Sequence, residues 1–165
     1  MSQASHLNRA ERPRAKVLVV VDDTAECDRA LVFAGRMAER MGANIILLAL
    51  PGEKTFREWI GIGDLIEDEE AERCREALAA AATRIKASPN VQLECIVRFG
   101  ARSAQVMRIL AEDPDISFLV LAASSSESGP GPLVTSLVGK SAGAFPVPIV
   151  IVPETMTDDV ISALL

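Results

Sequence analysis

Short runs of consecutive apolar residues, separated by stretches with helical periodicity, make up most of this chain. The runs are rich in Val, Ile and Leu and lie at Val17–Val21, Ile45–Leu50, Val91–Val97, Phe118–Ala122 and Ile149–Val152. Apolar residues at consecutive positions, rather than at alternating ones, are typical of strands that helices cover on both faces. The pattern therefore predicts an α/β fold, with a parallel sheet of five strands between two layers of helices.

Four amphipathic segments between these runs predict the helices. The first follows Asp22, where Asp23 or Thr24 can cap a helix and Glu26 completes a capping box with Asp23, and it ends at Gly42. The others are predicted over Asp68–Ala87, over Arg102–Glu112 between Gly100 and Pro114, and over Leu133–Ala144 before Pro146 and Pro148. Right-handed crossovers then bring the loops after the first, second and fourth strands to one edge of the sheet, where α/β proteins bind ligands.

One of these loops, Ser124–Pro132, has an unusual composition. It lies between a buried strand and a helix start, where backbone N–H groups and the helix dipole favour a phosphate. Four serines can donate hydrogen bonds there, and Gly129 and Gly131 allow tight turns. Glu127 acts in the opposite direction, because its charge repels an anion.

The amino-acid composition argues against a membrane protein and against a nucleic-acid-binding protein. The chain has 165 residues, 49% of them hydrophobic, which suits one compact domain, and no apolar run is long enough to cross a membrane. The net charge of −6 and the absence of a basic cluster make nucleic acid a poor partner. The three cysteines form no CxxC pair, which suits a reducing compartment, so we expect a cytoplasmic protein with no membrane partner.

Residues with recognisable catalytic chemistry are scarce. His6 is the only histidine and lies in a polar N-terminal stretch, so we expect no metal site and no dedicated enzyme, although a carboxylate-only mechanism stays open. Cys27 begins a helix, where the dipole can lower its thiol pKa, or it is simply packed. The segment Phe56–Ile66, which contains Trp59, is interpreted as a cover over the sheet, with a lid or a partner-binding patch as alternatives.

Three segments resemble the universal stress protein family. Val19–Leu31 is similar to that family's first strand and helix, Val91–Glu112 to its third strand and following helix, and Leu119–Pro153 to its closing strand, loop, helix and strand. The resemblance covers roughly residues 16–153, leaving residues 1–15 as a polar N-terminal tail and 154–165 as an amphipathic C-terminal tail. It implies an adenine nucleotide alpha hydrolase-like fold with strand order 3-2-1-4-5.

The resemblance also implies a nucleotide site. Nucleotide-binding members carry the loop pattern Gly-x2-Gly-x9-Gly-[Ser/Thr], whose counterparts here are Ala122, Ser125, Thr135 and Ser136. Three glycines are lost, and glycine allows positive φ and close approach of the backbone to a phosphate. Thr135 is the most disruptive because it is β-branched where the chain is expected to bend into the helix. Replacing Thr135 with glycine is therefore predicted to restore binding if its side chain is the only obstacle.

Two further positions complete the candidate site. The family's first-strand Asp lies beside the bound adenosine, which here is Asp22, and Leu50 ends the second strand at the same edge. Asp22 can instead cap the next helix. The candidate ligands are ATP and AMP.

The expected function is that of a stress-response regulatory or interaction protein, acting as a homodimer without robust catalysis. The dimer is expected to form through the last strand, Ile149–Val152, because an exposed apolar edge strand tends to pair with another chain. An unknown protein would be its partner. The alternative is an adenine-nucleotide binding module with weak ATP hydrolysis.

Overall fold

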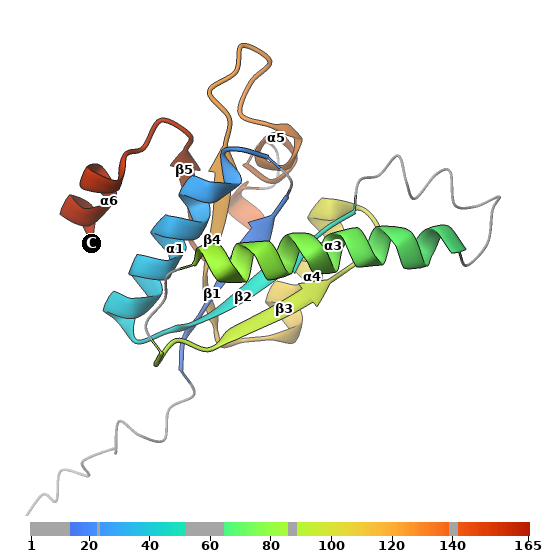
Figure 1. Cartoon of the computed structure of the whole chain (residues 1–165), viewed down its shortest axis with the longest axis horizontal. Coiled ribbons are helices and arrows are strands. Elements are labelled where there is room, and N and C mark those ends of the chain that lie inside the picture. Colours follow the sequence, from blue (N-terminus) through green and yellow to red (C-terminus); the bar gives the residue numbers. More distant parts are fainter. Residues whose placement is uncertain (1–13, 23, 52–64, 86–88, 139–141) are drawn as a thin grey trace, which may run out of the picture.

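A parallel sheet with helices on both faces forms the body of the molecule (Figure 1). The computed structural model describes residues 14–22, 24–51, 65–85, 89–138 and 142–165. Its strands are β1 (Lys16–Val21), β2 (Asn44–Ala49), β3 (Leu93–Val97), β4 (Ile116–Ala123) and β5 (Ile149–Pro153). Every pairing is parallel and the order is β3-β2-β1-β4-β5, which confirms the predicted topology.

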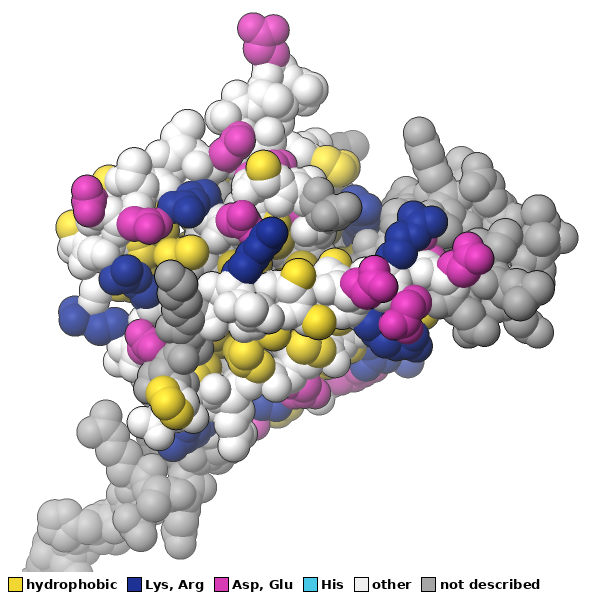
Figure 2. Space-filling view, in the orientation of Figure 1, with side chains coloured by type: hydrophobic (Ala, Val, Ile, Leu, Met, Phe, Trp, Pro, Cys, Tyr) yellow, Lys and Arg dark blue, Asp and Glu magenta, His cyan; other side chains and the backbone are white. Residues whose placement is uncertain are grey.

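The helices divide between the two faces of the sheet. They are α1 (Cys27–Met41), α3 (Leu65–Arg84), α4 (Arg102–Glu112), α5 (Pro132–Val138) and α6 (Asp158–Leu164), with a short 3-10 helix at Ala142–Ala144. One face carries α1, α3 and α6, and the other carries α4 and α5 (Figure 1). Figure 2 shows the α1 and α3 face, where acidic and basic side chains are mixed rather than gathered into one basic patch.

Alternating residues of the central strands fill the two halves of the core. Val17 and Val19 of β1 point to the α1 side, whereas Leu18 and Val20 point to the α4 side. The sheet is therefore buried on both faces along β1, β2 and β4, as consecutive apolar residues predict. The edge strands are less covered, with Leu93 of β3 exposed to 37% and Ile151 of β5 to 38%.

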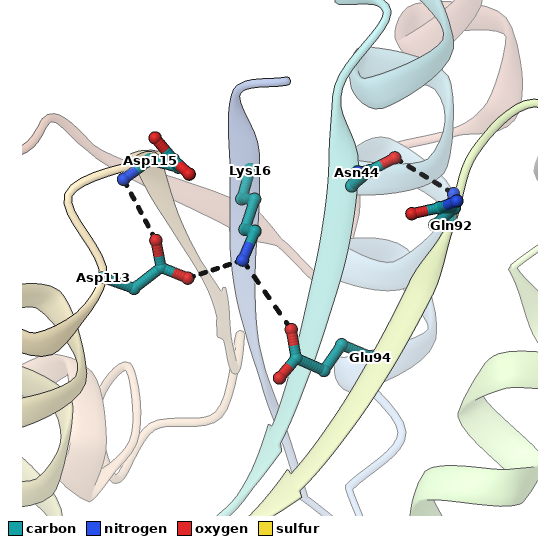
Figure 3. A network of polar contacts seen from close by, with 6 residues as sticks. All are labelled: Lys16, Asn44, Gln92, Glu94, Asp113 and Asp115. Atoms are coloured by element: carbon teal, nitrogen blue, oxygen red, sulfur yellow. Dashed lines mark hydrogen bonds and ion pairs between the residues drawn. The ribbon is translucent and has the colours of Figure 1, made fainter. Parts of the chain in front are cut away.

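A polar network ties the amino ends of the strands together (Figure 3). Lys16 Nζ lies 2.7 Å from Asp113 Oδ2 and 3.8 Å from Glu94 Oε2, so β1 is bound to the segment before β4 and to β3 itself. The hydrogen bond to Asp113 raises the Lys16 pKa above its ordinary value. The Gln92 N–H donates to Asn44 Oδ1 at 3.2 Å and joins the start of β2 to the segment before β3.

The start of α1 differs from the predicted capping box. The helix begins at Cys27, and Glu26 before it makes no side-chain cap hydrogen bond. A tight turn over residues 24–26 supplies the acceptors, because the N–H groups of Cys27, Asp28 and Arg29 donate to the carbonyls three residues earlier. The cap at Thr24 is therefore wrong, and Asp23 lies outside the described residues. At the other end, Gly42 closes α1 with φ of 64°, as predicted.

The last predicted helix is shorter than expected. Leu133–Ala144 was predicted as one helix, but α5 covers only Pro132–Val138, and residues 142–144 form a 3-10 turn. The physical reason is composition: Ala142, Gly143 and Ala144 have no large side chain to pack on the sheet, and glycine disfavours helix. Residues 139–141 lie outside the described residues, as does the stretch 52–64 that contains Trp59.

The C-terminal segment packs on its own domain. Ile161 of α6 is completely buried in the core beside α1, and Arg29 of α1 forms an ion pair of 2.5 Å with Asp158. The predicted amphipathic tail thus docks within the chain. Among the described residues, no helix has the length and apolar character needed to cross a membrane.

Candidate functional site

Asp22 directly follows β1 at the carboxyl edge of the sheet. Its Oδ1 accepts a hydrogen bond from the Thr24 N–H at 3.3 Å and a second, short one from the Thr24 hydroxyl. These bonds hold the turn that precedes α1. Asp22 therefore stabilises a turn, rather than capping the helix, and its carboxylate stays at the surface of the strand edge.

A hollow of about 530 Å³ opens between the ends of β1 and β2 and the side of α3. Asp22 and Leu50 line it, together with Arg73 and Ala77 of α3 and Arg102 at the start of α4. Leu50 is almost completely buried and supplies an apolar wall. The volume lies in the range of small-molecule sites in proteins.

A second hollow, of about 240 Å³, lies between the ends of β1 and β4 and the start of α5. Ala122 and Gly131 line it, and Asp22 and Arg102 line this hollow as well as the larger one. The two hollows therefore adjoin along the carboxyl ends of β2, β1 and β4, and we call them together the carboxyl-end cleft. This is the edge at which ligands bind in open α/β sheets.

The predicted phosphate loop has donors, but its own chain uses them. The Ser125 N–H and hydroxyl both donate to Glu154 Oε2, at 3.1 Å and 2.8 Å. The bond from the hydroxyl, followed by that from the N–H, lowers the Glu154 pKa below its ordinary value. A carboxylate of the protein thus occupies the donors of Ser125 that a ligand phosphate would need.

Thr135 and Ser136 lie within α5. The Thr135 hydroxyl donates to the Gly131 carbonyl at 2.8 Å and the Ser136 hydroxyl to the Leu133 carbonyl at 3.0 Å. The chain bends into the helix at Gly131, and both Gly129 and Gly131 have φ of 100°. No non-glycine residue of the described parts has positive φ. The expectation that the bend falls at Thr135 is therefore wrong, because the glycines of the loop make it four residues earlier.

The structure brings half of the predicted positions together. Asp22, Leu50 and Ala122 line the carboxyl-end cleft, whereas the linings of its two hollows, as far as the structure describes them, do not include Ser125, Thr135 and Ser136. Sequence reasoning missed Arg102 and Glu154. Each had a signal: Arg102 starts a helix at this edge, and Glu154 directly follows the last strand at the same edge.

Cys27 does not have the chemistry of a reactive thiol. It is the first residue of α1 and is buried within the core cluster, and burial raises its pKa to about 11, although the hydrogen bond with the Asp22 backbone lowers it. The helix dipole thus does not produce a thiolate, and the packed interpretation is confirmed. No group of three or more His, Cys, Asp or Glu among the described residues is placed to hold a metal ion.

Solved structures with this architecture come from several organisms. The universal stress protein UspA from Lactobacillus plantarum is 19% identical, with a TM-score of 0.64 over 86% of this chain and 99% of that one. The Archaeoglobus fulgidus universal stress protein in complex with dAMP is 19% identical, with a TM-score of 0.56 over 84% and 97%. A family protein from Arabidopsis thaliana with AMP bound is 17% identical, with a TM-score of 0.53 over 88% and 93%. At these identities the likeness shows the fold.

A comparison with curated proteins finds no match. The family comparison does, because the universal stress protein family model matches residues 13–153. This match spans all five strands and every crossover helix between them. With its strand order and its cleft at the carboxyl edge, the chain belongs to the universal stress protein family.

Proposed function

We propose that this protein is a cytoplasmic stress-response regulator that acts by binding rather than by catalysis. Its ligand is an adenine nucleotide, held in the carboxyl-end cleft, and its regulatory output is contact with a partner protein. The observation that carries this proposal is the cleft itself, whose two adjoining hollows are lined by Asp22, Leu50 and Ala122 from the carboxyl ends of three separate strands.

The chemistry of the cleft suits a nucleoside. A carboxylate such as that of Asp22 can accept hydrogen bonds from ribose hydroxyls, and apolar walls such as Leu50 suit a base. Relatives with the same fold were solved with dAMP and with AMP, which supports the adenine choice. Ligand occupancy would favour one conformation of the protein, and that change is what a partner could detect.

Turnover is not part of this proposal. The described lining of the cleft offers carboxylates, two arginines and apolar side chains, and the proposal assigns them to binding and orienting a nucleotide. Asp22 Oδ1 already accepts hydrogen bonds from the Thr24 N–H and hydroxyl. We therefore expect ATP hydrolysis to be slow or absent.

Homodimerisation through β5 completes the proposal. In the described sheet β5 pairs with β4 only, so its other edge is open, and Ile151 on that strand is partly exposed. An open apolar edge favours pairing with a second chain.

A second candidate is an interaction protein that binds no nucleotide. The contact between Ser125 and Glu154 favours it, because the donors of Ser125 are satisfied without a ligand. In that case the dimer or the partner complex would carry the whole function.

Thermal unfolding with a nucleotide panel separates the two candidates. Protein purified without ligand is melted with AMP, ATP, adenosine or GMP. At a hundred times its Kd a ligand adds about 2.7 kcal/mol, which for a chain of this size raises Tm by about 5–10 °C. Adenine compounds should produce such a shift and GMP should not, and Asp22→Asn should reduce it. An unmoved Tm for every compound, with the dimer intact, would favour the interaction protein instead.

A further inference from the structure

Arg102, the first residue of α4, lines both hollows of the carboxyl-end cleft. Its Nε is buried and has no hydrogen-bond partner, and no ion pair involves its guanidinium within the described parts of the chain. A buried donor without an acceptor is costly, and a charged one more so. This arrangement is expected of an arginine side chain that binds an anionic ligand.

Several other arginines of the described chain lie close to carboxylates. Arg29, Arg84 and Arg108 each form an ion pair with a carboxylate. Arg73, which also lines the larger hollow, lies 3.6 Å from Glu70. Arg98 has a similarly buried Nε, but its Nη2 lies 2.9 Å from Glu112. Arg102 therefore carries the least neutralised of these charges and sits at the ligand edge.

Three of the hydroxyls expected to hold a phosphate already donate within the chain. Ser125 donates to Glu154, Thr135 to the Gly131 carbonyl and Ser136 to the Leu133 carbonyl. A phosphate that entered the loop would also have to approach the Glu154 carboxylate. The positive charge that lines the smaller hollow is that of Arg102.

We propose that Arg102 binds the phosphate of a nucleoside monophosphate in the carboxyl-end cleft, in place of the Ser124–Pro132 loop. A guanidinium can donate two parallel hydrogen bonds to one phosphate. The start of α4 reinforces it, because Ala101 at the N-cap has no side-chain acceptor for the first N–H groups of the helix. This inference rests on the proposed function and specifies which nucleotide the cleft holds.

The charges that line the cleft favour a ligand with one phosphate over a ligand with three. The smaller hollow is lined by Asp22 and Glu26 against Arg102 alone. The larger one adds Glu70 and Glu76 against Arg73. A single phosphate can be matched by the Arg102 fork, whereas a triphosphate would bring further negative charge against these carboxylates.

Calorimetric titration of three proteins tests the assignment: the unmodified chain, Arg102→Gln, and the control Arg108→Gln on the same helix. The ligands are adenosine, AMP, ATP and inorganic phosphate. Losing a charge-assisted pair should weaken AMP binding about tenfold to a hundredfold in Arg102→Gln. Adenosine should bind all three proteins within about twofold, and Arg108→Gln should match the unmodified chain. Arg102→Lys, which keeps the charge without the fork, should bind AMP with intermediate affinity and serves if Arg102→Gln folds poorly.

The remaining outcomes separate the two proposals. Equal AMP binding by the unmodified chain and Arg102→Gln would overturn the role of Arg102 and leave nucleotide binding intact. If ATP binds more tightly than AMP, and Arg102→Gln does not change its affinity, the Ser124–Pro132 loop and not Arg102 would bind the phosphates. If no adenine compound binds the unmodified chain, the proposed function fails. In that case, inorganic phosphate that raises the Tm of the unmodified chain but not of Arg102→Gln would still support an anion site at Arg102. Phosphate without effect on the Tm of either protein would overturn that site as well.

Discussion

Glu154 is a residue whose charge state decides a local contact at the ligand edge. The hydroxyl and N–H of Ser125 lower its pKa, so the contact stabilises the folded state above the ordinary carboxyl pKa of 4.5. That contribution is lost as the pH falls through the lowered folded-state value. The sign follows from the direction: the folded chain binds this proton less readily than the unfolded chain.

Glu154→Gln should therefore be less stable than the unmodified chain near pH 7, and the difference should shrink as the pH falls below 4.5. Urea unfolding at a series of pH values measures it. The control is Glu127→Gln, which removes a charge from the loop that contains Ser125, at a residue for which the described parts of the chain show no acceptor contact. A difference independent of pH, or equal for both variants, would contradict the assignment of the lowered pKa to the Ser125 contact.

The place of a single residue in the site could be predicted where it lies at the end of a strand. It could not be predicted where the residue contacts a side chain from a distant segment. Asp22, Leu50 and Ala122 follow from the sheet topology, because each lies at the carboxyl end of a strand. The contact between Ser125 and Glu154 joins residues 29 positions apart. No local pattern encodes such a pair, and the roles of the two residues depend on the loop's path.

At the scale of elements, the loop that leads into α5 depends on one glycine conformation. Gly131 has φ of 100°, and Pro132 begins the helix immediately after it. An alanine there would be strained whatever space surrounds it. We expect Gly131→Ala to cost about 1–3 kcal/mol of unfolding free energy.

Chemical denaturation measures that cost, and Gly143→Ala is the matched control. Gly143 does not have positive φ, and nothing lies within 4 Å of the Cβ that it would gain. Its substitution should change stability by less than about 0.5 kcal/mol. A Gly131→Ala variant as stable as the control would mean that the loop adopts another path in solution.

The boundaries of a helix could be predicted from the sequence where helix-breaking residues lie on both sides of it. The bounds of α4, Arg102–Glu112, were predicted from Gly100 and Pro114. The start of α1 was not, because a backbone turn at residues 24–26 competes with side-chain capping and satisfies the same N–H groups. The end of α5 was not either, because Ala142 and Ala144 favour helix, whereas Gly143 between them disfavours it and the segment forms a 3-10 turn.

The two ends of the sheet differ in character across the whole molecule. Lys16, Asp113 and Glu94 join the amino ends of the strands by ion pairs (Figure 3). The carboxyl ends carry the cleft and Arg102, whose Nε has no partner among the described residues. The ion pairs at the amino ends fix the strands relative to one another, and so fix the carboxyl edge where a ligand would bind. A ligand bound as proposed would act on the loops at the other end of the sheet.

The proposed dimer depends on the open edge of β5, and a charge placed there tests it. Ile151→Lys puts an ammonium on the strand at a side chain that is already 38% exposed, so the fold should tolerate it while edge pairing should not. Leu93→Lys is the matched control, because it adds the same charge to β3 at the opposite edge, where the side chain is 37% exposed. Light scattering after size exclusion should report a dimer for the unmodified chain and Leu93→Lys, and a monomer for Ile151→Lys at micromolar concentration. A dimer that survives in Ile151→Lys but dissociates in Leu93→Lys would move the interface to β3, and monomers throughout would remove homodimerisation from the proposed function.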